Sequence, residues 1–140
     1  MFEIILLLNA IWFAMGFHAF WIRNKVFAKT LVSREERATP VFDMLAESGK
    51  FVGGFNFAFC VLNILLLVYP EVFPAPGQRI ILCLAFAIAH GSQFLPNVFI
   101  SLQNRKGKGV WQVKGRMLFI FVTDFVLMIA NLVVAAVYAF

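Results

Sequence analysis

The sequence predicts an all-α protein in which four transmembrane helices form one bundle, with residues 1–140 as a single domain. Of the 140 residues, 62% are hydrophobic and 14% are charged, whereas soluble domains are about 45–50% apolar and about 25% charged. The mean hydropathy is +0.88. The apolar residues fall into four runs, each long enough to cross a hydrocarbon core of about 30 Å. These observations exclude a soluble domain, a disordered chain and a nucleic-acid-binding module.

The four apolar runs are the predicted membrane spans, and they cover approximately residues 2–22, 45–68, 80–102 and 117–140. The first run is interrupted only by Glu3 at its edge. It has no basic leader and no small-residue cleavage site before Arg23, so we expect it to remain as the first helix rather than act as a signal peptide. Strands of a β-barrel would alternate apolar and polar residues over about ten positions, and no such pattern occurs.

The connections between the spans carry signals of their own. Residues 25–32 place Phe27 and Leu31 four positions apart with lysines on the other face, which predicts a short interfacial helix. Asp43 is the expected N-cap of the second span, because its side chain accepts hydrogen bonds from the free N–H groups of a first turn. The proline-rich segment 69–79 predicts a rigid turn between the second and third spans.

The positions of the basic residues predict how the bundle is oriented. Ten of the 12 Lys and Arg residues lie in segments 23–37 and 105–116, whereas segment 69–79 is nearly uncharged. The positive-inside rule therefore places both basic loops in the cytoplasm and both termini on the non-cytoplasmic side, in a membrane such as the bacterial inner membrane. Topology and contact with anionic lipid head groups account for the positive net charge, so no nucleic-acid partner is expected.

Polar side chains inside the spans are the candidate functional residues, because ionisable groups in a membrane are costly and usually face the interior of a bundle. The third span carries His90, Gln93, Asn97 and Ser101 along one helical face, and Pro96 predicts a kink in the same stretch. The ionisable residues of all spans are His18, Glu47, Lys50, His90 and Asp124, and the accompanying amides are Asn9, Asn56, Asn63, Gln93, Asn97 and Asn131.

The helical rise places these residues at two depths from the cytoplasmic boundary. A shallow group lies up to about 10 Å deep and contains His18, Glu47, Lys50, Asn97 and Asp124. A deeper pair, His90 and Asn56, lies at about 15–20 Å. One polar cavity opening toward the cytoplasm would hold both levels. We predict His90 and Asp124 as acid–base residues. The predicted ligand-binding side chains are His18, Glu47, Lys50, Asn56, Gln93 and Asn97.

Structural explanations compete with these functional ones. Asparagines in spans commonly hydrogen-bond one helix to another, which is the alternative for Asn9, Asn63 and Asn131. Glu47 and Lys50 are three positions apart on one helix, so they are also expected to pair with each other at the membrane interface. For Asp124 an interior role is favoured, because a carboxylate at this depth has to be paired or protonated.

Metal and haem sites have little support in the sequence. No HxxxH or ExxH spacing occurs, so no metal site is predicted. His18 and His90 differ in depth by about 14 Å, which argues against bis-histidine haem ligation. A haem with His90 as its single axial ligand stays an open alternative, and His18 is alternatively an interfacial aromatic residue beside Trp21. The cofactor is therefore left undefined.

Three short motifs resemble small, uncharacterised bacterial four-helix membrane proteins of the domain-of-unknown-function kind. They are His18 with Trp21 late in the first span, Gly-Gly-Phe-Asn at 53–56, and Ala-His-Gly-Ser-Gln at 89–93. The layout is also similar to small membrane isomerases and emopamil-binding-like proteins, in which acidic and histidine residues line a hydrophobic pocket. The first resemblance implies the four-helix fold, and the second implies acid–base chemistry at a pocket.

Three functions follow as hypotheses. The favoured one is an intramembrane binding protein, or an accessory subunit of a membrane complex, with a Phe-rich pocket for a lipid or other apolar small molecule. The second is an isomerase-like enzyme in which His90 or Asp124 moves a proton on an apolar substrate. The third is a subunit of a proton-coupled transporter. The expected partners are membrane lipids, and Gly16 and Gly53 on apolar faces favour a homo-oligomer.

Overall fold

The computed structural model describes all 140 residues and contains helices but no strands. Its long helices are α1 Phe2–Phe17, α3 Pro40–Val68, α4 Pro76–Asn104 and α5 Arg116–Ala139. Helix α1 continues without a break into a π-helical turn, η1, His18–Ile22. Together with that turn, the four helices are long and apolar enough to cross a membrane. The predicted all-α architecture and its four spans are therefore confirmed.

Short elements occupy the connections, and one of them corrects an expectation. They are α2 Asn24–Ala28 and the 3-10 turns η2 Glu35–Ala38 and η3 Pro70–Val72. The prediction of Asp43 as an N-cap was wrong, because α3 begins at Pro40 with Thr39 as its N-cap. Proline suits a first helical position, since its φ is already helical and it has no N–H to leave unbonded. Asp43 instead pairs with the Lys25 ammonium at 2.8 Å.

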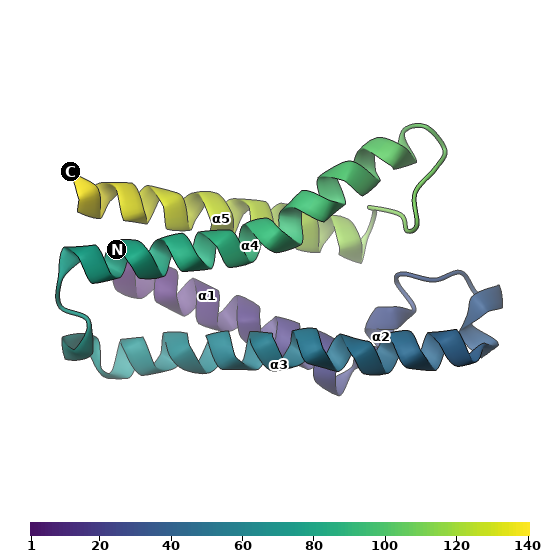
Figure 1. Cartoon of the computed structure of the whole chain (residues 1–140), viewed down its shortest axis with the longest axis horizontal. Coiled ribbons are helices and arrows are strands. Elements are labelled where there is room, and N and C mark those ends of the chain that lie inside the picture. The colour runs from purple at the N-terminus through teal and green to yellow at the C-terminus, as the bar shows by residue number, and fades with distance from the viewer.

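The four helices pack as two pairs. Helix α1 lies against α3, and α4 lies against α5, while α1 also contacts α5 and so joins the pairs (Figure 1). Both termini and the turn containing η3 lie at one end of the bundle, which we call the terminal end. The loops holding α2 and η2, and the loop between α4 and α5, lie at the opposite end, which we call the basic end because it carries the two basic segments.

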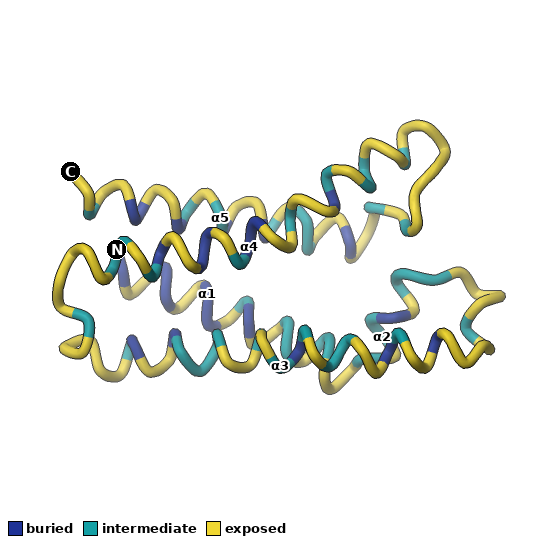
Figure 2. Tube along the Cα trace, viewed as in Figure 1, coloured by how far each residue is buried: buried dark blue, intermediate teal, exposed yellow.

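The terminal half of the bundle is closed by a hydrophobic core. Buried side chains of all four long helices meet there, and Figure 2 shows the buried positions on the inner sides of the helices. Phe13 of α1 stacks on Phe59 of α3 with ring centroids 5.1 Å apart, and it also contacts Phe86 of α4. The core residues are Phe2, Ile5, Leu6, Phe13, Leu66, Cys83, Phe86, Leu127, Val134 and Ala135. This packing holds the two pairs together.

Toward the basic end the two pairs diverge. Helix α4 remains helical through Pro96, and its last turns bend away from the other helices (Figure 1). Proline donates no backbone hydrogen bond, so the carbonyl of Ser92 is released and the helix bends, as predicted. Asn104 ends α4 and orders the following loop, because its side chain bonds the carbonyls of Lys108 and Trp111.

Two glycines permit close helix contacts inside the chain. A Cβ at Gly53 would lie 3.0 Å from the backbone nitrogen of Trp21, so η1 reaches α3 only because this position lacks a side chain. Gly16 lies directly against the side chain of Asn56. Both contacts join elements of the same chain. Gly53 is buried within one chain, whereas Gly16 is half-buried and lines the cleft described below, and the homo-oligomer stays a prediction.

Candidate functional site

A cleft of about 1050 Å³ lies between the two helix pairs in the basic half. Its volume is at the upper end of the range of about 300–1,000 Å³ that is usual for small-molecule sites. Of its 25 lining residues 17 are hydrophobic, so the walls suit an apolar molecule. The remaining lining residues include the polar or charged side chains of His18, Arg23, Asn56, Ser92, Gln93, Arg116 and Asp124.

Phenylalanines supply much of the apolar wall. They come from both helix pairs, since Phe13, Phe55 and Phe59 belong to α1 and α3 whereas Phe119 belongs to α5. Phe55 on α3 and Ile88 on α4 also line the cleft, yet they are 69% and 72% exposed. These exposed apolar residues indicate that the cleft opens sideways, between α3 and α4, onto the outer surface of the bundle.

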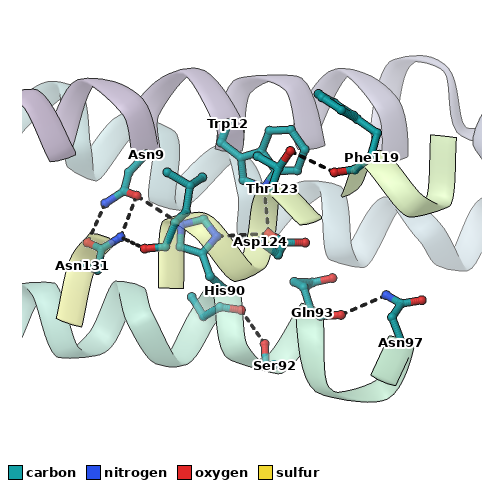
Figure 3. A network of polar contacts seen from close by, with 12 residues as sticks. Asn9, Trp12, His90, Ser92, Gln93, Asn97, Phe119, Thr123, Asp124 and Asn131 are labelled. Atoms are coloured by element: carbon teal, nitrogen blue, oxygen red, sulfur yellow. Dashed lines mark hydrogen bonds and ion pairs between the residues drawn. The ribbon is translucent and has the colours of Figure 1, made fainter. Parts of the chain in front are cut away.

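A buried polar network lies behind the cleft, reaches it at Trp12 and Asp124, and connects α1, α4 and α5 (Figure 3). Asn9 and Asn131 exchange two amide hydrogen bonds of 3.0 Å each. His90 Nε2 lies 3.1 Å from Oδ1 of the Asn9 side chain, and His90 Nδ1 lies 3.1 Å from Asp124 Oδ1. The same Asp124 oxygen accepts a 2.8 Å bond from the indole N–H of Trp12. The network therefore cross-links three helices through buried side chains.

The hydrogen bonds in this network determine where protons lie. Asn131 donates to the Leu127 carbonyl, which fixes the orientation of its amide. Asn9 must then turn its oxygen toward Asn131 and His90, so His90 Nε2 is the donor and carries a hydrogen. His90 Nδ1 consequently faces Asp124 either as a second donor to a carboxylate or as an acceptor from a protonated acid. In both cases the pair shares one proton and has no net charge, as burial requires.

Asp124 presents one oxygen to the network and the other to the cleft. Oδ1 takes part in both hydrogen bonds, with Trp12 and with His90, whereas Oδ2 bonds to no group of the chain. Oδ2 retains some accessible surface, and Asp124 lines the cleft. His90 lies behind it, fully buried and stacked on Phe13 with ring centroids 5.0 Å apart. Asp124 is thus the group that a molecule in the cleft would meet, and His90 positions it.

The predicted site residues separate into two groups. His18, Asn56, Gln93 and Asp124 line the cleft, and His90 reaches it only through Asp124. The other three predicted residues do not line it, and they are Glu47, Lys50 and Asn97.

Local contacts explain why those three residues are elsewhere. Glu47 and Lys50 form an exposed ion pair of 2.6 Å on the outer side of α3, as the structural alternative expected. Asn97 accepts a 3.1 Å bond from the indole N–H of Trp111 and donates to the Gln93 carbonyl. Its role is to hold the loop between α4 and α5. Glu47, Lys50 and Asn97, which were expected in the shallow group, therefore do not join His18 and Asp124 in the cleft.

Three residues of the cleft were not anticipated. Trp12 donates to Asp124, and it lies one helical turn from Asn9 on the same face, a spacing that could have associated it with the polar face. Arg23 and Arg116 line the cleft at its basic end, although in the sequence they served only as topology signals. The alternative role for Asn9 and Asn131 is confirmed, whereas Asn63 bonds only the Phe59 carbonyl of its own helix.

Acidic side chains and carbonyl groups neutralise only some of the positive charges at the basic end. Lys25, which follows η1, donates to Asp43, and this hydrogen bond raises the pKa of the lysine above its ordinary value. The Arg37 guanidinium donates to the carbonyls of Lys29 and Val32. The basic end nevertheless keeps a positive field, because acidic side chains pair with only part of its Lys and Arg residues.

Comparisons of the chain with known protein families, curated proteins and solved structures found no match. The resemblance in the short motifs therefore stays an expectation, and the functional assignment rests on the geometry of the cleft.

Proposed function

We propose that this protein is an integral membrane protein that binds the apolar chain of a lipid-like molecule in the cleft between its helix pairs. The observation that carries this proposal is the cleft itself, about 1050 Å³ in volume, predominantly apolar, and bounded at its inner end by the Asp124 carboxyl group. An apolar chain entering between Phe55 and Ile88 would remain in contact with apolar side chains throughout. Asp124 Oδ2 would accept a hydrogen bond from a hydroxyl or N–H group of the ligand.

The proposal includes an orientation, with the basic end in the cytoplasm and the termini on the other side of a bacterial inner membrane. The clustering of Lys and Arg at one end supports it. A cysteine introduced as Lys108→Cys is expected to resist a membrane-impermeant maleimide added to intact cells and to react once the inner face is exposed. Both native cysteines lie inside the spans α3 and α4 and serve as the unlabelled background. Labelling of Lys108→Cys in intact cells would contradict the orientation.

Filling the cleft is expected to abolish binding. Ala85 lines the cleft from α4, so Ala85→Trp places an indole in the space that the ligand would occupy. We expect the affinity for monooleoylglycerol, an uncharged probe with one apolar chain, to fall by about tenfold or more, since about 1.4 kcal/mol of lost contact has that effect. Native mass spectrometry of the protein released from phosphatidylcholine nanodiscs measures the bound fraction as the probe is titrated.

Ala136→Trp is the matched control, because Ala136 is exposed on α5 and lies outside the cleft. It should bind the probe as the native protein does. Circular dichroism of both variants checks that the helices are retained. Saturable binding that is equal in Ala85→Trp and Ala136→Trp, or no saturable binding by the native protein, would contradict the proposal.

A second function, acid–base catalysis on a bound apolar substrate, is favoured by one observation. Asp124 Oδ2 faces the cleft while Oδ1 shares a proton with His90, the arrangement of an acid–base residue backed by a partner that orients it. Asp124→Asn separates the two functions. A binding protein with this substitution should still deliver the co-purified molecule unchanged, whereas an enzyme should accumulate its substrate in place of its product.

A further inference from the structure

Two arginines line the cleft at its basic end, on opposite walls, and we call this end the mouth of the cleft. Arg23 follows η1 and belongs to the pair formed by α1 and α3, whereas Arg116 begins α5 and belongs to the other pair. Of the 12 Lys and Arg residues, only these two line the cleft. Both are exposed, and neither guanidinium donates a hydrogen bond or forms an ion pair within the chain. Their donors are therefore free for a ligand.

No acidic side chain neutralises this mouth. The only carboxylate that lines the cleft is Asp124, which follows Arg116 by eight residues on α5 and so lies about 12 Å deeper along the helix. Near the basic end, Asp43 pairs with Lys25 and Glu47 pairs with Lys50, while Glu35 and Glu36 of η2 do not line the cleft. The mouth is thus positive, and the wall below it is apolar.

We propose that the ligand of the cleft is a membrane amphiphile with a phosphate head group, which Arg23 and Arg116 hold while its chain lies in the cleft. This inference rests on the proposed binding function. Guanidinium groups bind phosphate through paired N–H···O hydrogen bonds, and a phosphate offers enough oxygens to accept them from two arginines at once. A phosphate between the arginines would also relieve the repulsion between two uncompensated positive charges.

The continuity of the cleft favours an amphiphile over a free anion. Of the 25 residues that line the whole cleft, 17 are hydrophobic, and inorganic phosphate would make no use of this apolar surface. The distance of about 12 Å between Arg116 and Asp124 matches a stretch of hydrocarbon chain rather than a head group. Entry between α3 and α4 would bring the chain directly from the lipid phase, with its head group at the basic end.

Two probes that share one oleoyl chain test this inference. Monooleoylglycerol carries no charge, and oleoyl lysophosphatidic acid adds a phosphate to the same structure. We expect the native protein in phosphatidylcholine nanodiscs to bind the phosphate probe about tenfold more tightly or better, because charge-assisted hydrogen bonds are the strong ones. In the double variant Arg23→Gln/Arg116→Gln the two affinities should agree within about twofold. Arg105→Gln, an exposed arginine outside the cleft, should keep the native preference.

The outcomes separate this inference from the proposal on which it rests. Equal binding of the two probes by the native protein, or a phosphate preference that survives in the double variant, would overturn the assignment of Arg23 and Arg116 while leaving chain binding intact. Failure of both probes to bind would overturn chain binding itself. Competition by inorganic phosphate as effective as that by the phosphate probe would show an anion site without a chain, which also contradicts the inference.

Discussion

Replacing His90 by alanine is expected to lower the free energy of unfolding by about 3–5 kcal/mol, the usual cost of removing one partner from a buried charged pair. The substitution leaves Asp124 buried without the group that shares its proton, and it leaves the Asn9 oxygen with one bond fewer. It also removes a ring that stacks on Phe13. Equilibrium unfolding in detergent micelles, followed by circular dichroism, measures the loss.

Ser92→Ala is the control for this prediction, since Ser92 lies on the same helix, is exposed, and bonds only the Ala89 carbonyl of its own helix. Its effect should be small. The double variant His90→Ala/Asp124→Ala should cost less than the two single variants added together, because it leaves no unpaired carboxylate in the interior. If His90→Ala cost no more than Ser92→Ala, the network would not hold the bundle together.

Adding a single methyl group at Gly53 is expected to destabilise the protein by about 1–3 kcal/mol. The new Cβ would lie 3.0 Å from both the backbone nitrogen and the Cβ of Trp21. Backbone atoms do not rotate away as a side-chain tip does, so Gly53→Ala must push η1 from α3. This displacement would also disturb the wall of the cleft that η1 supplies, where His18 lies.

The neighbouring residue provides a control of opposite sign. At Gly54 a Cβ would lie 3.6 Å from the Trp21 ring, an ordinary contact, and alanine is favoured over glycine in a helix by up to about 1 kcal/mol. Gly54→Ala is therefore expected to leave the protein as stable as before or slightly more stable. Thermal unfolding of the two variants in the same detergent compares them, and equal effects would contradict the close contact between η1 and α3.

The four apolar helices and the bend at Pro96 were predictable because they depend on local chemistry. Runs of apolar residues define spans, and a proline removes one backbone hydrogen bond wherever it occurs. The placement of Asp43 was wrong for a related reason, since the two possible N-caps, Thr39 and Asp43, lie four residues apart and the helix begins at the proline after the earlier one. Distance in sequence from a membrane boundary, by contrast, did not distinguish Glu47 and Lys50 from residues that face the cleft.

The sequence by itself determined that the chain has four helices long and apolar enough to cross a membrane, with ten of its 12 basic residues at one end, because hydropathy and charge are properties of each segment alone. It also singled out Asp124 and His90 as costly groups that need partners. Only the tertiary structure decided which side chains are their partners. It also decided that Trp12 and two arginines line the same cleft as Asp124. Such contacts depend on how the helices pair and rotate about their axes, and those are set by packing between segments far apart in the chain.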